Sequence, residues 1–119
     1  MDQYTALYKI LTFDEHRETA IDAYLMFNDE SFRFLLTKDI LLHVLDLCIQ
    51  TKITLYDLEE WACFVDARDE IIKDTFEDYL YALSNPAIMC GYDMTQQGYQ
   101  ALALKMSKVK AMHDCLILL

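Results

Sequence analysis

The sequence predicts an all-α protein, a compact single domain over residues 1–119 that forms a bundle of about five to seven helices. Hydrophobic residues make up 55% of the chain, which is enough for a substantial core. The chain contains 2 Gly and 1 Pro, so it has few of the residues that hairpin turns and strand bulges need. Apolar residues also recur at three- and four-residue spacings, as they do on the buried face of a helix.

Two helices and a short segment are predicted in the first third of the chain. Residues 2–11 form the first helix. Thr12 and Glu15 then fit a capping box, in which the Thr hydroxyl accepts a hydrogen bond from the N3 amide and the Glu reaches back. This predicts a second helix up to about Phe27, with an inner face formed by Ala20, Ile21, Tyr24 and Leu25. Ser31 is predicted to cap a short segment that holds Phe32, Phe34, Leu35 and Leu36.

Two further helices are predicted in the middle of the chain. Residues 38–50 are apolar nearly all round, so this helix is predicted to be central. Its polar residues form one narrow stripe: Asp39, His43, Asp46 and Gln50. Thr54 begins the next helix as its N-cap, with Asp57 in the capping-box position. The core face of that helix follows the i, i+3, i+4, i+7 pattern with Leu58, Trp61, Ala62 and Val65. Trp61 is predicted to be a core anchor.

An acidic helix is predicted from Asp69 to Leu83, after a break at residues 66–68. Its inner stripe is formed by Ile72, Phe76, Tyr79, Leu80 and Leu83. On the opposite side, acids recur at i,i+4, where each like-charge pair costs about 0.2–0.5 kcal/mol. These acids are Glu70, Asp74 and Asp78. The helix dipole favours acids in the first turn, but Glu77 and Asp78 lie beyond its reach on this predicted helix.

Pro86 ends the acidic helix, because the residue before a proline avoids the α region. Residues 87–93 are predicted as a loop, and a last helix is predicted from Thr95 towards Leu118. Its inner side is formed by Leu102, Met106, Val109, His113 and Leu116. This last region is the only one with a net positive charge, which comes from Lys105, Lys108 and Lys110.

The net charge of −10 narrows the classes of partner. Binding to nucleic acid is driven by Lys and Arg that neutralise phosphates, so no nucleic-acid partner is predicted. An anionic membrane surface is disfavoured for the same reason, and no apolar run is long enough to span a membrane. A basic protein would be attracted, although an acidic balance also serves solubility alone.

The four Cys form no CxxC pair, and the first ten residues lack a basic n-region, which predicts a cytoplasmic protein.

The sequence lacks the patterns of an enzyme, and no catalytic residue, cofactor or metal is predicted. The three His lie in different predicted helices, and no nucleophile elbow or phosphate-binding Gly loop is present. A divalent metal held by Asp66, Asp69 and Glu70 would lack the Gly turn and ligand spacing of an EF-hand loop. A metal site of His43 with Asp39 or Asp46 remains an alternative, but a solvated or hydrogen-bonded structural His is favoured because no third ligand is identifiable nearby.

The region 50–88 resembles small helical immunity proteins that accompany bacterial contact-dependent growth-inhibition toxins and related bacteriocin-type toxins. Four features carry the resemblance: the helix start Ile53-Thr54, the core Glu59-Glu60-Trp61-Ala62, the corner Asp66-Ala67-Arg68-Asp69 and the stop Ser84-Asn85-Pro86. Ala67 stands where the family usually has Gly. The resemblance implies an all-helical protein that binds a cognate toxin domain and neutralises it without catalysis of its own. It implies no shared set of binding residues.

The binding face must therefore be predicted on physical grounds. A nuclease toxin needs a basic cleft to hold phosphates, and an acidic surface matches such a cleft. An exposed Tyr beside the acids is typical of an interface hot spot. These arguments predict a partner-binding surface formed by Asp66, Asp69, Glu70, Asp74, Glu77, Asp78 and Tyr81. The alternative is an acidic adaptor or antagonist of another basic protein, such as a phage-type inhibitor or an anti-regulator.

Overall fold

The computed structural model describes the backbone of residues 1–85 and 99–119, and the side chains of residues 1–85 and 105–119. Within these residues the chain forms α1 (Gln3–Leu11), α2 (Arg17–Leu25), β1 (Phe34–Leu35), α3 (Lys38–Ile49), α4 (Leu55–Asp66), β2 (Ile71–Ile72), the 3₁₀ helix η1 (Asp74–Phe76), α5 (Glu77–Ser84) and α7 (Tyr99–Ile117). The predicted all-α class is confirmed, with one two-stranded sheet as a minor addition. The predicted loop at 87–93 and the predicted helix start at Thr95 lie outside the described residues.

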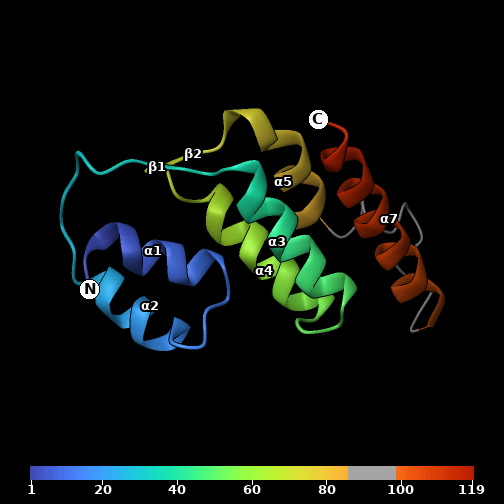
Figure 1. The fold of residues 1–119 in the computed structure, drawn as a ribbon, viewed down its shortest axis with the longest axis horizontal. Helices are drawn as coiled ribbons and strands as arrows, with labels where there is room; N and C mark the ends of the chain where they lie inside the picture. The colour runs from blue at the N-terminus through green and yellow to red at the C-terminus, as the bar shows by residue number, and fades with distance from the viewer. Residues whose placement is uncertain (86–98) are drawn as a thin grey trace.

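Helices α1 and α2 pack against each other as a hairpin on one side of the molecule (Figure 1). The predicted capping box at Thr12 is wrong, because the Thr12 hydroxyl instead donates to the Tyr8 carbonyl at 2.8 Å and closes the end of α1. Phe13 then takes a positive φ of 53°, and the Asp14 carboxylate accepts a hydrogen bond from the His16 amide. Helix α2 therefore begins at Arg17, and its predicted inner residue Leu25 is exposed.

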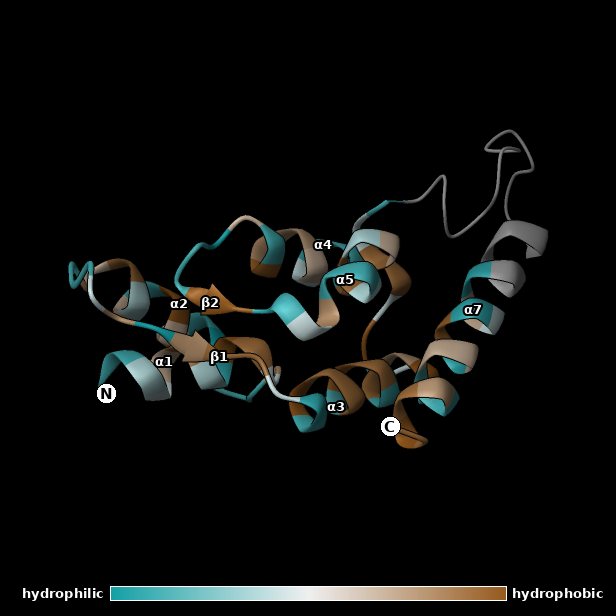
Figure 2. Ribbon diagram, turned by 90° about the horizontal axis from the view of Figure 1, so that it is seen from above, coloured by the Kyte–Doolittle hydropathy of each residue, from teal (hydrophilic) through white to brown (hydrophobic). Residues whose placement is uncertain are grey.

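Strand β1 lies in the short segment that Ser31 was predicted to cap, and strand β2 lies where the first turn of the acidic helix was predicted. They pair in parallel, with Phe34 opposite Ile71 and Leu35 opposite Ile72. Phe34 and Ile71 are buried, whereas their neighbours Leu35 and Ile72 are exposed. Phe34 and Leu35 of the predicted Ser31-capped segment thus form a strand and no helix. In Figure 2 the hydrophobic residues of β2 are flanked on both sides by hydrophilic segments.

The predicted acidic helix from Asp69 is wrong in its first half, because the chain first pairs as β2 and then turns through η1. Helix α5 begins only at Glu77, so Glu70, Asp74 and Asp78 do not lie on one helix. The i,i+4 repulsion expected among them does not apply. Glu77 and Asp78 occupy the first turn of α5, where the helix dipole favours acids. The predicted inner residue Ile72 is exposed, and Ile71 takes its place in the core.

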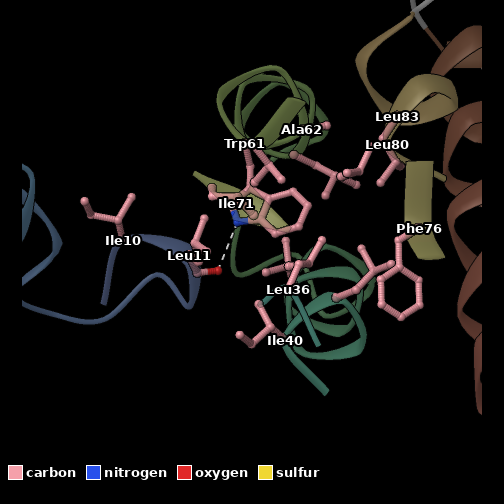
Figure 3. Close-up of a cluster of buried hydrophobic side chains, with 14 of the residues drawn as sticks. Ile10, Leu11, Leu36, Ile40, Trp61, Ala62, Ile71, Phe76, Leu80 and Leu83 are labelled. Carbon is pink, nitrogen blue, oxygen red and sulfur yellow. Dashed lines mark hydrogen bonds between the residues drawn. The ribbon is translucent and has the colours of Figure 1, made fainter. Parts of the chain in front are cut away.

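The core lies between α1, α3, α4, α5 and α7 and forms one cluster of buried hydrophobic side chains (Figure 3). Helix α3 is central, as predicted, and contacts both α4 and α7. The capping box of Thr54 and Asp57 starts α4, and all four predicted core residues of α4 are buried. Trp61 is 1% exposed, and its Nε1 donates to the Leu11 carbonyl at 3.0 Å. This hydrogen bond joins the α1–α2 hairpin to the central helices.

Candidate functional site

Four of the seven residues predicted to bind a partner line one open depression of about 490 Å³. Asp66 comes from the end of α4, Asp69 from the corner before β2, Asp74 from η1 and Glu77 from the start of α5. Ile71 and Ile72 of β2 also line the depression, together with Arg33 and Lys73. The parallel pairing with β1 holds β2 in place. Strand β2 separates Asp66 and Asp69, which precede it, from Asp74 and Glu77, which follow it.

The two cations of this depression, Arg33 and Lys73, form no ion pair with its acids. Lys73 Nζ donates to the Arg68 carbonyl at 2.8 Å. Arg33 Nη1 donates to the carbonyls of Glu30 and Phe32, at 3.0 and 2.7 Å. The carboxylates of Asp66, Asp69, Asp74 and Glu77 make no ion pair or hydrogen bond within the residues whose side chains are described. Residues 86–104 contain no Lys or Arg.

We call this set of four carboxylates, Asp66, Asp69, Asp74 and Glu77, the acidic depression. All four side chains are exposed. The four carboxylates outnumber the two cations that line the same depression, Arg33 and Lys73. Like charges repel one another, and a bound basic group would relieve the repulsion that remains. The acidic depression can therefore bind cationic side chains.

The other three predicted residues differ in their surroundings. Asp78 and Tyr81 lie on the exposed side of α5, and Tyr81 is 60% exposed. Tyr81 follows Glu77 by four residues on the same helix, so the two share a face. Asp78 and Tyr81 therefore extend the acidic depression along α5.

Glu70 has a structural role and is only partly exposed. Its Oε2 accepts a hydrogen bond from the Tyr24 hydroxyl at 2.7 Å and lies 3.9 Å from Arg68 Nη1. Its backbone carbonyl accepts from the Phe34 amide at 2.9 Å. Glu70 thus ties α2 and β1 to the corner before β2. Tyr24 was not predicted to belong to this region, since its contact with Glu70 spans 46 residues.

These contacts set the pKa of Glu70. Partial burial favours the neutral carboxyl, but the hydrogen bond from Tyr24, a backbone hydrogen bond and the charges of Arg68 and Lys73 outweigh it. The pKa of Glu70 is therefore lowered from its ordinary value. Burial and the neighbouring Glu70 carboxylate raise the pKa of Tyr24, so its hydroxyl keeps its proton and remains the donor.

Tyr24→Phe is expected to raise the pKa of Glu70 and to lower the free energy of unfolding by about 1–2 kcal/mol at neutral pH. A carboxyl with a depressed pKa contributes stability above its unfolded pKa and loses it as pH falls through the folded pKa. The difference between wild type and variant should therefore be constant above about pH 5 and shrink at lower pH. Denaturant unfolding at several pH values, with NMR titration of the Glu70 carboxyl, measures both effects. An equal difference at acidic and neutral pH would contradict this role of Glu70.

His43, considered above as a metal ligand, contacts the backbone instead. Its Nε2 lies 3.0 Å from the Thr12 carbonyl. A carbonyl only accepts hydrogen bonds, so Nε2 carries the proton in this contact. In residues 1–85 and 105–119, no group of three or more His, Cys, Asp or Glu side chains is placed to hold a metal ion. None of the described helices is both long and apolar enough to cross a bilayer.

No protein-family model, curated protein or solved structure matches this chain.

Proposed function

We propose that this chain is an inhibitory binding protein that covers a basic surface of a partner protein with the acidic depression, Asp78 and Tyr81. One observation carries the proposal: the four carboxylates of the acidic depression are exposed and have no cationic partner among the described residues. Arg33 and Lys73, the cations that line the same depression, donate hydrogen bonds to backbone carbonyls. The four carboxylates are therefore available to bind cations from another molecule.

The physical basis is electrostatic complementarity. A concentrated patch of one sign raises the association rate with an oppositely charged surface, and close charge pairs add to affinity. Tyr81 supplies a large, rigid contact beside these charges, which is typical of residues that dominate binding energy. Glu70 contributes indirectly, because it holds the corner that presents Asp69.

We further propose that the partner is a bacterial toxin domain with a basic active cleft, such as a nuclease, and that the chain neutralises it in the cytoplasm without catalysis of its own. This step rests on the resemblance of residues 53–86 to immunity proteins. The capped start of α4 at Thr54 and the corner between Asp66 and Asp69 belong to that resemblance, and the corner also supplies two acids of the depression.

Growth rescue tests this proposal. The partner is first captured from the native cell with tagged protein at low salt and identified. Expression of the partner alone is expected to arrest growth, and co-expression of this chain is expected to restore it. The Asp69→Lys/Asp74→Lys variant, at equal cellular level, should fail to restore growth. A captured basic partner that does not impair growth would contradict the toxin assignment and favour an acidic adaptor. Equal rescue by the variant would contradict the assigned surface.

A further inference from the structure

A second exposed feature lies beside the acidic depression, at the end of α2. Leu25, Met26 and Phe27 are consecutive and are 64%, 84% and 39% exposed. Single exposed apolar residues are common, but a run of three consecutive exposed ones is unfavourable in a protein that does not use it. We call these three residues the apolar patch. Such patches, when rimmed by polar groups, mark interaction sites.

The apolar patch is presented by an ordered segment. The amides of Met26 and Phe27 donate to the carbonyls of Ala23 and Tyr24, which continues the last turn of α2. Beyond the patch, residues 28–33 arch from α2 to β1 (Figure 1). The Asp29 carboxylate accepts from both the amide and the hydroxyl of Ser31, at 2.9 and 2.6 Å. A segment held in this way loses less conformational entropy when a partner binds.

The charges around the patch indicate the chemistry of its occupant. Leu25 and Phe27 line a second depression, of about 380 Å³, whose rim includes Glu30 and Asp69. Neither of these carboxylates makes an ion pair or hydrogen bond within the described side chains. Arg33 is held by the Glu30 and Phe32 carbonyls, and Arg68 lies near Glu70 and over the Phe64 ring at 4.8 Å. The rim therefore favours an apolar group flanked by cations.

The two depressions adjoin each other, because Arg33 and Asp69 line both of them. A partner segment that places a cation against Asp69 therefore lies at the rim of the depression that Leu25 and Phe27 line. This shared rim argues that one partner occupies both depressions.

We infer that the apolar patch is an anchor site for the same basic partner, and that it receives a large apolar side chain flanked by Lys or Arg in the partner's sequence. This inference rests on the proposed function, since the acidic depression supplies the charge attraction. The acids provide the attraction at a distance, and the patch provides the buried apolar contact that slows dissociation.

Two short labelled peptides test the inference at low ionic strength. One carries arginines on both sides of a central Leu-Phe pair, and the matched peptide has Ser-Ser in that position. Fluorescence anisotropy should show about tenfold tighter binding of the Leu-Phe peptide. Leu25→Ser/Met26→Ser should abolish this difference and leave binding of the Ser-Ser peptide unchanged. Leu118→Ser, a substitution of a leucine that is 87% exposed and lines neither depression, should preserve the difference.

The outcomes separate the two proposals. If both peptides bind equally to wild type, or if Leu118→Ser removes the difference as fully as the patch variant does, the anchor site is contradicted and the acidic depression is not. If Asp69→Lys/Asp74→Lys leaves the binding of the Ser-Ser peptide unchanged, or if neither peptide binds, the proposed function itself is contradicted.

Discussion

Trp61→Ala is expected to lower the free energy of unfolding by about 3–5 kcal/mol. Trp61 is 1% exposed within the core cluster, so truncation leaves a large cavity among side chains from several helices. It also removes the donor to the Leu11 carbonyl, which joins α4 to α1. A domain of this size has a total stability of about 5–15 kcal/mol, so the variant should be close to unfolding. Urea denaturation followed by far-UV circular dichroism measures the change.

Two variants separate the causes of this loss. Trp61→Phe keeps most of the apolar volume and removes the hydrogen bond, so it should cost about 1–3 kcal/mol. Tyr56→Ala truncates an aromatic residue on the same helix that is 66% exposed, and it should change stability by about 0.5 kcal/mol or less. A Trp61→Ala variant no less stable than Tyr56→Ala would show that Trp61 does not anchor the core.

Asp69→Lys/Asp74→Lys is expected to weaken binding of the captured partner by about 100-fold or more. Each substitution removes an attractive charge and adds a repulsive one within the acidic depression. Both side chains are exposed and lie outside the α-helices, so the fold should tolerate the change. Glu77 is a poorer choice, because it lies in the first turn of α5 and a lysine there opposes the helix dipole. Surface plasmon resonance measures the affinity.

The matched control is Glu15→Lys/Asp114→Lys, which places no lysine in the first turn of a helix. It changes the net charge by the same amount at two exposed acids that do not line the acidic depression. Affinity should fall only a few-fold, through the long-range field. An equal loss of affinity in both double variants would show that total charge, and not the acidic depression, governs binding.

Much of the helical core could be predicted from local patterns. The capping box at Thr54 and the four-residue core face around Trp61 depend on neighbours within a few positions, and both are confirmed. The strand pairing between Phe34 and Ile71 could not be predicted in this way, because its two sides are 37 residues apart and each strand has two residues. Thr12 misled for a related reason: its hydroxyl serves the preceding helix, whereas the capping-box pattern considers only the residues that follow.

The arrangement of the candidate site could not be predicted from local sequence patterns either. Glu70, Asp74, Glu77 and Asp78 were predicted to lie along one side of a helix. The structure instead brings together Asp66, Asp69, Asp74 and Glu77, from the end of α4, the corner before β2, η1 and the start of α5. The participation of Arg33 depends on the β1–β2 pairing and has no local signal. The amino-acid composition indicated that the surface carries a negative charge. The arrangement around a depression, and the structural role of Glu70, follow from long-range contacts.

The central claim is that an acidic depression binds a basic partner, and the salt dependence of association tests it most directly. Between about 0.01 M and 1 M salt, the screening length falls from about 30 Å to about 3 Å. The association rate constant of wild-type protein with its captured partner should fall by about tenfold or more over this range, and that of Asp69→Lys/Asp74→Lys should fall much less. A wild-type association rate that does not change with salt would contradict the claim.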